Sequence, residues 1–171
     1  MKALYARAMD WLYLACTVIA GIGVVVMTLV IPYGVFMRYV LNSAVPWPEP
    51  MSVLMMILFT FLGAAACYRA GVHIAVGLLT QQLSPAPKRA MSFLVDLLMA
   101  ALSLFMVVYG TELLALTMNQ VIAEFPFLPV GITYLPIPLG GAITLLFIIE
   151  HAWIGPPPSE SIVHREPTPV N

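Results

Sequence analysis

The feature that most constrains this chain is a series of long apolar segments, the first of which runs from Leu12 to Met37 without a charged residue. A helix rises about 1.5 Å per residue and the hydrocarbon core of a bilayer is about 30 Å thick, so about 20 apolar residues suffice to cross it. Hydrophobic residues make up 61% of the 171 residues and charged residues only 9%, too few to coat a soluble globule. The sequence therefore predicts an integral membrane protein.

Four segments have the length and composition of a transmembrane helix. We expect an all-α membrane protein in which residues 1–154 form a single four-span domain, with spans at about 11–37, 50–72, 90–118 and 131–154. The first span is too long for the apolar part of a signal peptide, so we expect it to be retained. Pro32 predicts a bend within it.

The two ends of the chain differ from the spans in composition. Lys2, Arg7 and Asp10 precede the first apolar segment and suggest a short interfacial helix at the N-terminus. Residues 155–171 are rich in proline and polar residues and are predicted to be a disordered tail.

The distribution of basic residues predicts the orientation of the spans. Arg38 lies alone on one side of the predicted membrane, and the other side holds Lys2, Arg7, Arg69, Lys88, Arg89 and Arg165. Because cytoplasmic loops carry the excess of Lys and Arg, both termini are predicted to be cytoplasmic.

The third span carries two acidic residues, Asp96 and Glu112. They are separated by about 24 Å along a helix, so they cannot share one site. A charged side chain at mid-membrane costs about 2.5–3.5 kcal/mol, but each acid lies only about two turns from an end of the span. We expect them to reach headgroups or a basic group of a partner subunit. The alternative is an independent small transporter in which one of them binds an ion.

No pattern in the sequence indicates catalysis or a cofactor. Cys16 and Cys67 lie in apolar runs, where cysteine behaves as a small hydrophobe. The histidines, His73, His151 and His164, are too scattered for a metal or haem site. A net charge of -1 gives no field that would attract nucleic acid. We predict that the chain is not an enzyme and has no cofactor and no nucleic-acid partner; a small four-helix redox protein or haem anchor is the rival hypothesis.

Aromatic and basic residues mark the ends of the spans. Trp11, Trp47 and Trp153 fall at predicted span ends, as expected for amphipathic rings at headgroup level. Arg38 ends the first span and either reaches a lipid phosphate or pairs with Glu49 across the short loop.

Four short motifs follow one another along the chain: FMRYVLNSAVPWPEP from Phe36, FLGAAACYRAGVHIAV from Phe61, the pair Tyr109-Gly110, and YLPIPLGG from Tyr134. In their order and spacing they resemble the small permease subunit, of DctQ type, of tripartite ATP-independent periplasmic (TRAP) transporters. The residues that match the family's motifs are Arg38, Tyr39, Trp47, Glu49, Arg69, Gly71, His73, Val76, Pro138 and Gly140. The family commonly carries two adjacent acids where this chain has Glu49 followed by Pro50, which leaves a single carboxylate there.

The resemblance implies a location in the bacterial inner membrane and a set of partners. In such systems a periplasmic binding protein delivers an organic acid, a large permease subunit carries the substrate and sodium sites, and the small subunit braces the large one. Membrane lipid would cover the rest of the surface. For this chain the resemblance implies no catalytic, substrate-binding or metal-binding residue, and the matching residues are candidates for contacts with a subunit or with lipid.

Overall fold

The computed structural model describes residues 2–71 and 85–155, with the side chains of 4–71 and 91–155. The elements in chain order are α1 (Lys2–Tyr39), α2 (Pro48–Arg69), α4 (Pro85–Thr117), β1 (Val121–Ile122), β2 (Phe125–Pro129), α5 (Val130–Tyr134) and α6 (Pro136–Ile154). Four helical segments are long and apolar enough to cross a membrane: Leu4–Tyr39, Pro48–Arg69, Met91–Thr117 and Val130–Ile154. The predicted all-α fold with four spans is confirmed.

The helices differ from the predicted spans mainly at their ends. Residues 2–10 continue directly into α1, so no separate interfacial helix precedes the first span, and Pro32 is accommodated inside this one helix. The second helix ends at Arg69, earlier than predicted, because Gly71 adopts a left-handed backbone with a φ of 65°. The predicted disordered tail lies outside the described residues except for Gly155.

An antiparallel β-hairpin, which the sequence analysis did not predict, joins α4 to the last span. β1 pairs with β2, with Val121 opposite Pro129 and Ile122 opposite Phe125. The prolines of this segment explain the irregular entry into the last span: Pro129 precedes α5 with an extended backbone, and Pro136 begins α6. Phe127 projects from the hairpin and is 82% exposed.

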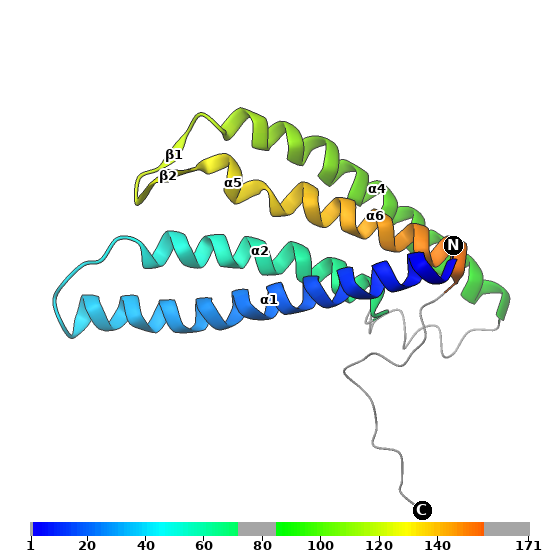
Figure 1. Cartoon of the computed structure of the whole chain (residues 1–171), viewed down its shortest axis with the longest axis horizontal. Helices are drawn as coiled ribbons and strands as arrows, with labels where there is room; N and C mark the ends of the chain where they lie inside the picture. The colour runs from blue at the N-terminus through cyan, green and yellow to red at the C-terminus, as the bar shows by residue number, and fades with distance from the viewer. Residues whose placement is uncertain (1, 72–84, 156–171) are drawn as a thin grey trace, which may run out of the picture.

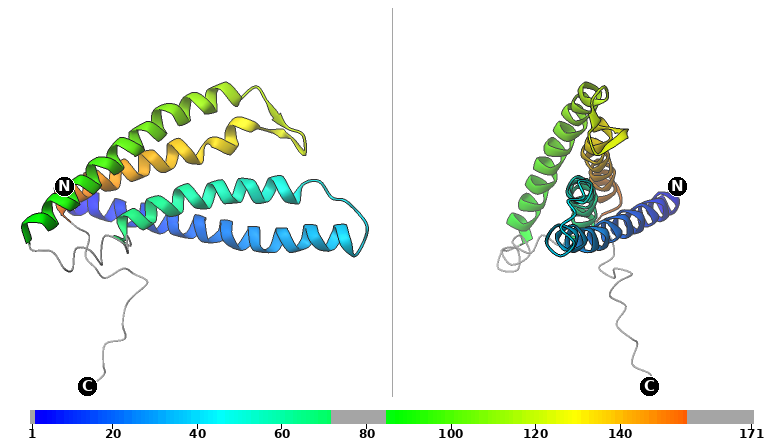
Figure 2. Two further views of the ribbon diagram at one scale, coloured as in Figure 1. Left: turned by 180° about the vertical axis from the view of Figure 1, so that it is seen from behind. Right: turned by 90° about the vertical axis from the view of Figure 1, so that its left-hand side faces the viewer.

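The four long helices are arranged as an open row in the order α1, α2, α6, α4 (Figures 1 and 2). α2 packs against α1 on one side and α6 on the other, and α4 packs on the far side of α6. The pair α1/α2 spreads away from the pair α4/α6 toward the end that holds residues 40–47 and the hairpin (Figure 1). The pairs meet at the opposite end, where α1 begins and α6 ends.

Close packing within the row depends on small residues and on α6. A Cβ atom at Gly140 of α6 would lie 3.0 Å from both the Cβ and the carbonyl oxygen of Phe61 on α2. On the other side of α6, a Cβ at Gly141 would lie 2.8 Å from the carbonyl oxygen of Ser103 on α4. Without a hydrophobic driving force between helices in lipid, such close backbone approach is a main source of association. Gly140 and Gly141 therefore let α6 sit between α2 and α4.

We predict that Gly140→Ala destabilises the chain by about 1–3 kcal/mol, the usual cost of overpacking. The added methyl group would push α6 away from the rigid backbone of α2 at Phe61. Thermal unfolding of the purified chain in detergent measures the effect. Gly21→Ala is the matched control, because nothing lies within 4 Å of a Cβ there. Equal melting temperatures for the two variants would contradict this account of the α2–α6 contact.

Candidate functional site at the closed end of the helix row

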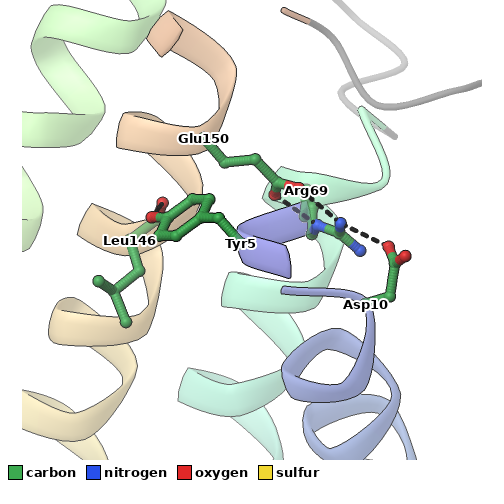
Figure 3. Close-up of polar contacts among 5 residues, drawn as sticks. All are labelled: Tyr5, Asp10, Arg69, Leu146 and Glu150. Carbon is green, nitrogen blue, oxygen red and sulfur yellow. Dashed lines mark hydrogen bonds and ion pairs between the residues drawn. The ribbon is translucent and has the colours of Figure 1, made fainter. Parts of the chain in front are cut away.

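A buried arginine links three helices at the end where the row closes. Arg69, the last residue of α2, donates from Nε to Glu150 Oε2 and from Nη2 to Glu150 Oε1, both at 2.7 Å (Figure 3). The same Nη2 donates to Asp10 Oδ1 of α1, also at 2.7 Å. We call Asp10, Arg69 and Glu150 the charged cluster.

Burial distinguishes the two carboxylates of the charged cluster. The side chains of Arg69 and Glu150 are only 8% and 5% exposed, whereas that of Asp10 is 54% exposed. The guanidinium also lies over the rings of Tyr13 and Phe147, 5.5 and 5.4 Å from their centroids. In such surroundings a bidentate arginine–carboxylate pair is well oriented, and removal of one partner leaves an uncompensated buried charge.

Tyr5 adds a second contact between α1 and α6 beside the charged cluster. Its hydroxyl donates to the carbonyl oxygen of Leu146 at 3.1 Å (Figure 3). Its ring lies 6.0 Å from that of Trp153, measured between centroids. The first turns of α1 are thereby held against α6, which explains why this polar segment extends the span as a packed helix.

A neighbouring group, which we call the Asp96 cluster, joins α4 to the same end of the row. Tyr68 donates its hydroxyl to Asp96 Oδ1 at 2.7 Å, and His151 Nδ1 lies 3.0 Å from Asp96 Oδ2. Tyr68 precedes Arg69 and His151 follows Glu150 in the sequence. The consecutive residues Tyr68-Arg69 and Glu150-His151 therefore connect α2 and α6 both to α1 and to α4.

The two acids of the predicted third span have different surroundings. Asp96 finds its partners within this chain, in Tyr68 and His151, where the sequence analysis expected headgroups or another subunit. Glu112 is exposed on α4, and no hydrogen bond or ion pair to it is recorded among the residues that the structure describes. Asp96 therefore stabilises the helix row, whereas Glu112 faces the surroundings of the chain.

The first family motif lies at the opposite, open end of the row and lines a groove of about 300 Å³ between α1 and α2. Arg38, Tyr39 and Glu49 all border this groove, and the predicted ion pair between Arg38 and Glu49 does not form in the described structure. Trp47 packs its ring against Tyr33, with the centroids 5.6 Å apart. These residues thus share one end of the chain but are not bonded into a cluster.

The remaining motif residues serve packing and turns where the structure describes them. Pro138 and Gly140 are buried in α6, and a Cβ at Gly110 of α4 would lie 2.9 Å from Pro138 Cδ. Gly71 forms the left-handed turn after α2. His73 and Val76 lie outside the described residues.

The sequence analysis missed the partners of Arg69 and Asp96 at the closed end, which are Asp10, Tyr68, Glu150 and His151. A usable signal was present, because antiparallel spans bring the start of α1, the end of α2 and the end of α6 to the same side of the membrane. Each of these ends carries a charged residue. Opposite charges at the same depth in the membrane predict ion pairs. They do not predict which carboxylate is buried.

The chemistry of the closed end is that of satisfied ion pairs. Both oxygens of Glu150 are occupied by Arg69, and both oxygens of Asp96 have a partner. Within the described residues, no group of three His, Cys, Asp or Glu side chains is placed to hold a metal ion. The arrangement fixes the helices relative to one another.

Comparison with known proteins identifies a family and a relative. Residues 27–155, most of the chain, match the family model of the DctQ component of tripartite ATP-independent periplasmic transporters. A protein of Haemophilus influenzae whose name is that of a TRAP transporter small permease protein is 26% identical over 124 residues, 72% of this chain and 76% of the relative. The match begins within α1, so Asp10 lies before it, while Arg69, Asp96 and Glu150 lie inside it.

We predict that Glu150→Gln destabilises the chain by about 3–5 kcal/mol, because the buried Arg69 would keep only the largely exposed Asp10 as a carboxylate partner. Asp10→Asn should cost about 1 kcal/mol or less, since Asp10 is largely exposed. Denaturation of the purified chain, followed by circular dichroism, measures both. Arg7→Gln, which removes an exposed charge of α1 without a recorded partner in the described structure, is the control. If Asp10→Asn lowers the unfolding free energy as much as Glu150→Gln does, the buried carboxylate is not the more important partner of Arg69.

A matched pair of alanine variants tests the difference between the two acids of α4. Asp96→Ala leaves the Tyr68 hydroxyl and His151 without their shared acceptor and should lower the unfolding free energy by about 1–3 kcal/mol. Glu112→Ala should change it by less than about 0.5 kcal/mol. The same denaturation measurement on the isolated chain gives the unfolding free energy of both variants. A larger loss for Glu112→Ala would show that Glu112 has an internal partner.

Proposed function

The chain belongs to the DctQ component family of tripartite ATP-independent periplasmic transporters, and from this premise we propose that it braces a large permease subunit during sodium-driven uptake of an organic acid. It is a TRAP transporter small subunit and a multi-pass membrane protein. In the complex, the small subunit would hold the non-moving part of the transporter in the bilayer and would contribute no solute site, sodium site or catalytic group.

The observation that carries the bracing role is the open helix row. α4 packs on α6 at one edge and α1 packs on α2 at the other. Among the four spans, the last one buries the largest share of its most apolar 18 residues, 44% against 6% in the span of α4. The outward surface of α4 exposes Phe93, Leu97, Leu104, Phe105, Val108 and Leu116. The described helices thus bury few residues and offer a broad surface to lipid and to another membrane protein.

Glu112 suggests which edge meets the partner. It lies on this apolar surface of α4, within the membrane-spanning segment, and no partner is recorded for it in the described part of the chain. A charged side chain facing hydrocarbon costs about 2.5–3.5 kcal/mol at the bilayer centre, and less toward the interface. A basic or hydrogen-bonding group of the large subunit would remove this cost. We therefore assign α4 to the contact with the large subunit.

The charged and Asp96 clusters suit the bracing role because they fix the helix order. A transport domain can move only relative to something that resists the force, and four helices joined by ion pairs at one end resist rearrangement better than helices held by lipid-facing contacts alone. The family premise supplies the other partner, a periplasmic binding protein that delivers the solute.

The proposed location is the bacterial inner membrane, with both termini in the cytoplasm. The start of α1, the end of α2 and the end of α6 lie at the closed end, and Arg38 lies at the open end (Figure 1). This arrangement is consistent with the excess of Lys and Arg on one side. The open end, with the hairpin and residues 40–47, would then face the periplasm.

We expect the tagged chain, co-expressed with a large permease subunit from the same transporter, to capture that subunit from detergent extracts. Glu112→Lys should reduce capture about tenfold or more, because a cation would oppose the basic group of the partner. Glu124→Lys, which reverses an exposed charge on the hairpin, is the matched control. Residual complexes of the Glu112→Lys variant, reconstituted with the binding protein, should show less uptake at an unchanged KM.

Solute binding provides the decisive comparison. The complex should bind an organic acid delivered by the binding protein and accumulate it under a sodium gradient, while the purified small subunit binds none. Binding by the small subunit alone would refute the bracing role, as would a visible absorbance band from a haem or flavin in the purified chain. Unchanged capture with Glu112→Lys would refute only the assignment of α4 to the interface.

A further inference from the structure

The groove at the open end of the row has the polarity of a site for an amphipathic molecule. Its walls are formed by α1 and α2 and are mostly aliphatic, including Ile31 and Val35 on α1 and Val53 on α2. Its charged side chains, Arg38 and Glu49, belong to the last turn of α1 and the first turn of α2. Ile31 lies about 10 Å below Arg38 along the helix axis, so the groove passes from a charged mouth to an apolar floor.

The depth of the groove matches the boundary between headgroups and hydrocarbon. Arg38 lies in the last turn of α1, directly after the uncharged residues 12–37, and the rings of Tyr33 and Trp47 pack on each other at the same end of the α1–α2 pair. Aromatic residues are enriched at the membrane interface, so we place the mouth of the groove there. Pro48 approaches α1 closely at Gly34, where a Cβ atom would lie 3.0 Å from the proline Cβ. Gly34 and Pro48 both line the groove, so the two helices are in close contact along it.

The two charges at the mouth define the headgroup that the groove would bind. Arg38 and Glu49 border the same groove, both are exposed, and no ion pair joins them in the described structure. Two hydroxyls also line the groove: Ser52 donates to the carbonyl oxygen of Pro48 at 2.7 Å, and Tyr39 is exposed. The mouth therefore offers one cation donor and one anion acceptor, which complement the phosphate and the ammonium of a zwitterionic phospholipid.

We propose that the Arg38–Glu49 groove is a binding site for phosphatidylethanolamine, with the phosphate on the Arg38 guanidinium, the primary ammonium on the Glu49 carboxylate, and an acyl chain along Ile31, Val35 and Val53. Phosphatidylcholine lacks ammonium protons and cannot donate to Glu49, and phosphatidylglycerol has no cation to offer it. The site goes beyond the bracing role and does not depend on it, since it lies entirely within this chain.

Native mass spectrometry of the purified full-length chain tests the site. The delipidated protein is titrated with phosphatidylethanolamine, phosphatidylcholine and phosphatidylglycerol that carry identical acyl chains. We expect one phosphatidylethanolamine to bind at least about tenfold more tightly than either of the others, the difference that one charge-assisted hydrogen bond provides. Arg38→Gln should weaken binding of phosphatidylethanolamine about tenfold or more. Glu49→Gln should abolish the preference and bring phosphatidylglycerol level with phosphatidylethanolamine.

Two kinds of control separate the groove from general lipid contact. Arg7→Gln removes a cation from the other end of α1, and Glu124→Gln removes a carboxylate from the hairpin, so neither should change the lipid preference. Val35→Trp fills the apolar floor while it leaves both charges in place, and should weaken all three lipids equally. Because these side chains are exposed, melting temperatures should stay within a few degrees of the wild type.

Three results would overturn the proposal. The first is equal binding of the three lipids by the wild type. The second is a loss in Arg38→Gln no larger than in Arg7→Gln. The third is a groove that binds no lipid in the isolated chain while Arg38→Gln reduces capture of the large subunit, which would make the groove a protein contact. None of these results bears on whether the complex transports an organic acid, so the groove and the bracing role fail separately.

Discussion

The buried pair of Arg69 and Glu150 is the interaction on which the helix row depends. It joins α2 to α6 with two parallel hydrogen bonds of 2.7 Å, and the same guanidinium reaches Asp10 on α1. Its neighbours in sequence, Tyr68 and His151, bind Asp96 on α4. These contacts join all four long helices at the closed end of the row. The desolvation of this pair is costly, so its value lies in specifying which helices meet.

The open shape of the row follows from the balance of forces in lipid. Apolar side chains gain little by packing on one another when the surrounding acyl chains are equally apolar, so association relies on close backbone contact and polar ties. Gly140 and Gly141 supply the close contacts on the two sides of α6. The polar ties are confined to the closed end, and toward the open end the two helix pairs spread apart (Figure 1). The ion pairs are thus located at one end of the row, and the separation between the helix pairs at the other.

This separation gives the residues of the family motifs different tasks. Arg69, in the second motif, holds the helices together, and Pro138 and Gly140 allow α6 to approach its neighbours. Arg38, Tyr39 and Glu49, in the first motif, border an exposed groove without bonds to one another. Within the described residues, the motif whose polar groups are paired supports the fold, whereas the motif whose charges are unpaired lies at the surface. The proposed bracing role would use both.

The sequence alone determined the four spans and the family, because apolar length and the order of short motifs are local properties of the chain. Helix geometry also placed Asp96 and Glu112 too far apart to share a site.

The sequence did not show that Arg69 pairs with Glu150 and Asp10, or that Asp96 has partners within the chain while Glu112 faces outward. These outcomes depend on the order of helices in the row and on the rotation of each helix about its axis. Hydrophobicity in a membrane does not encode that rotation, because an apolar residue is equally stable against lipid and against protein. Only the tertiary structure, through glycine contacts and buried ion pairs, decided which charges meet and which remain at the surface.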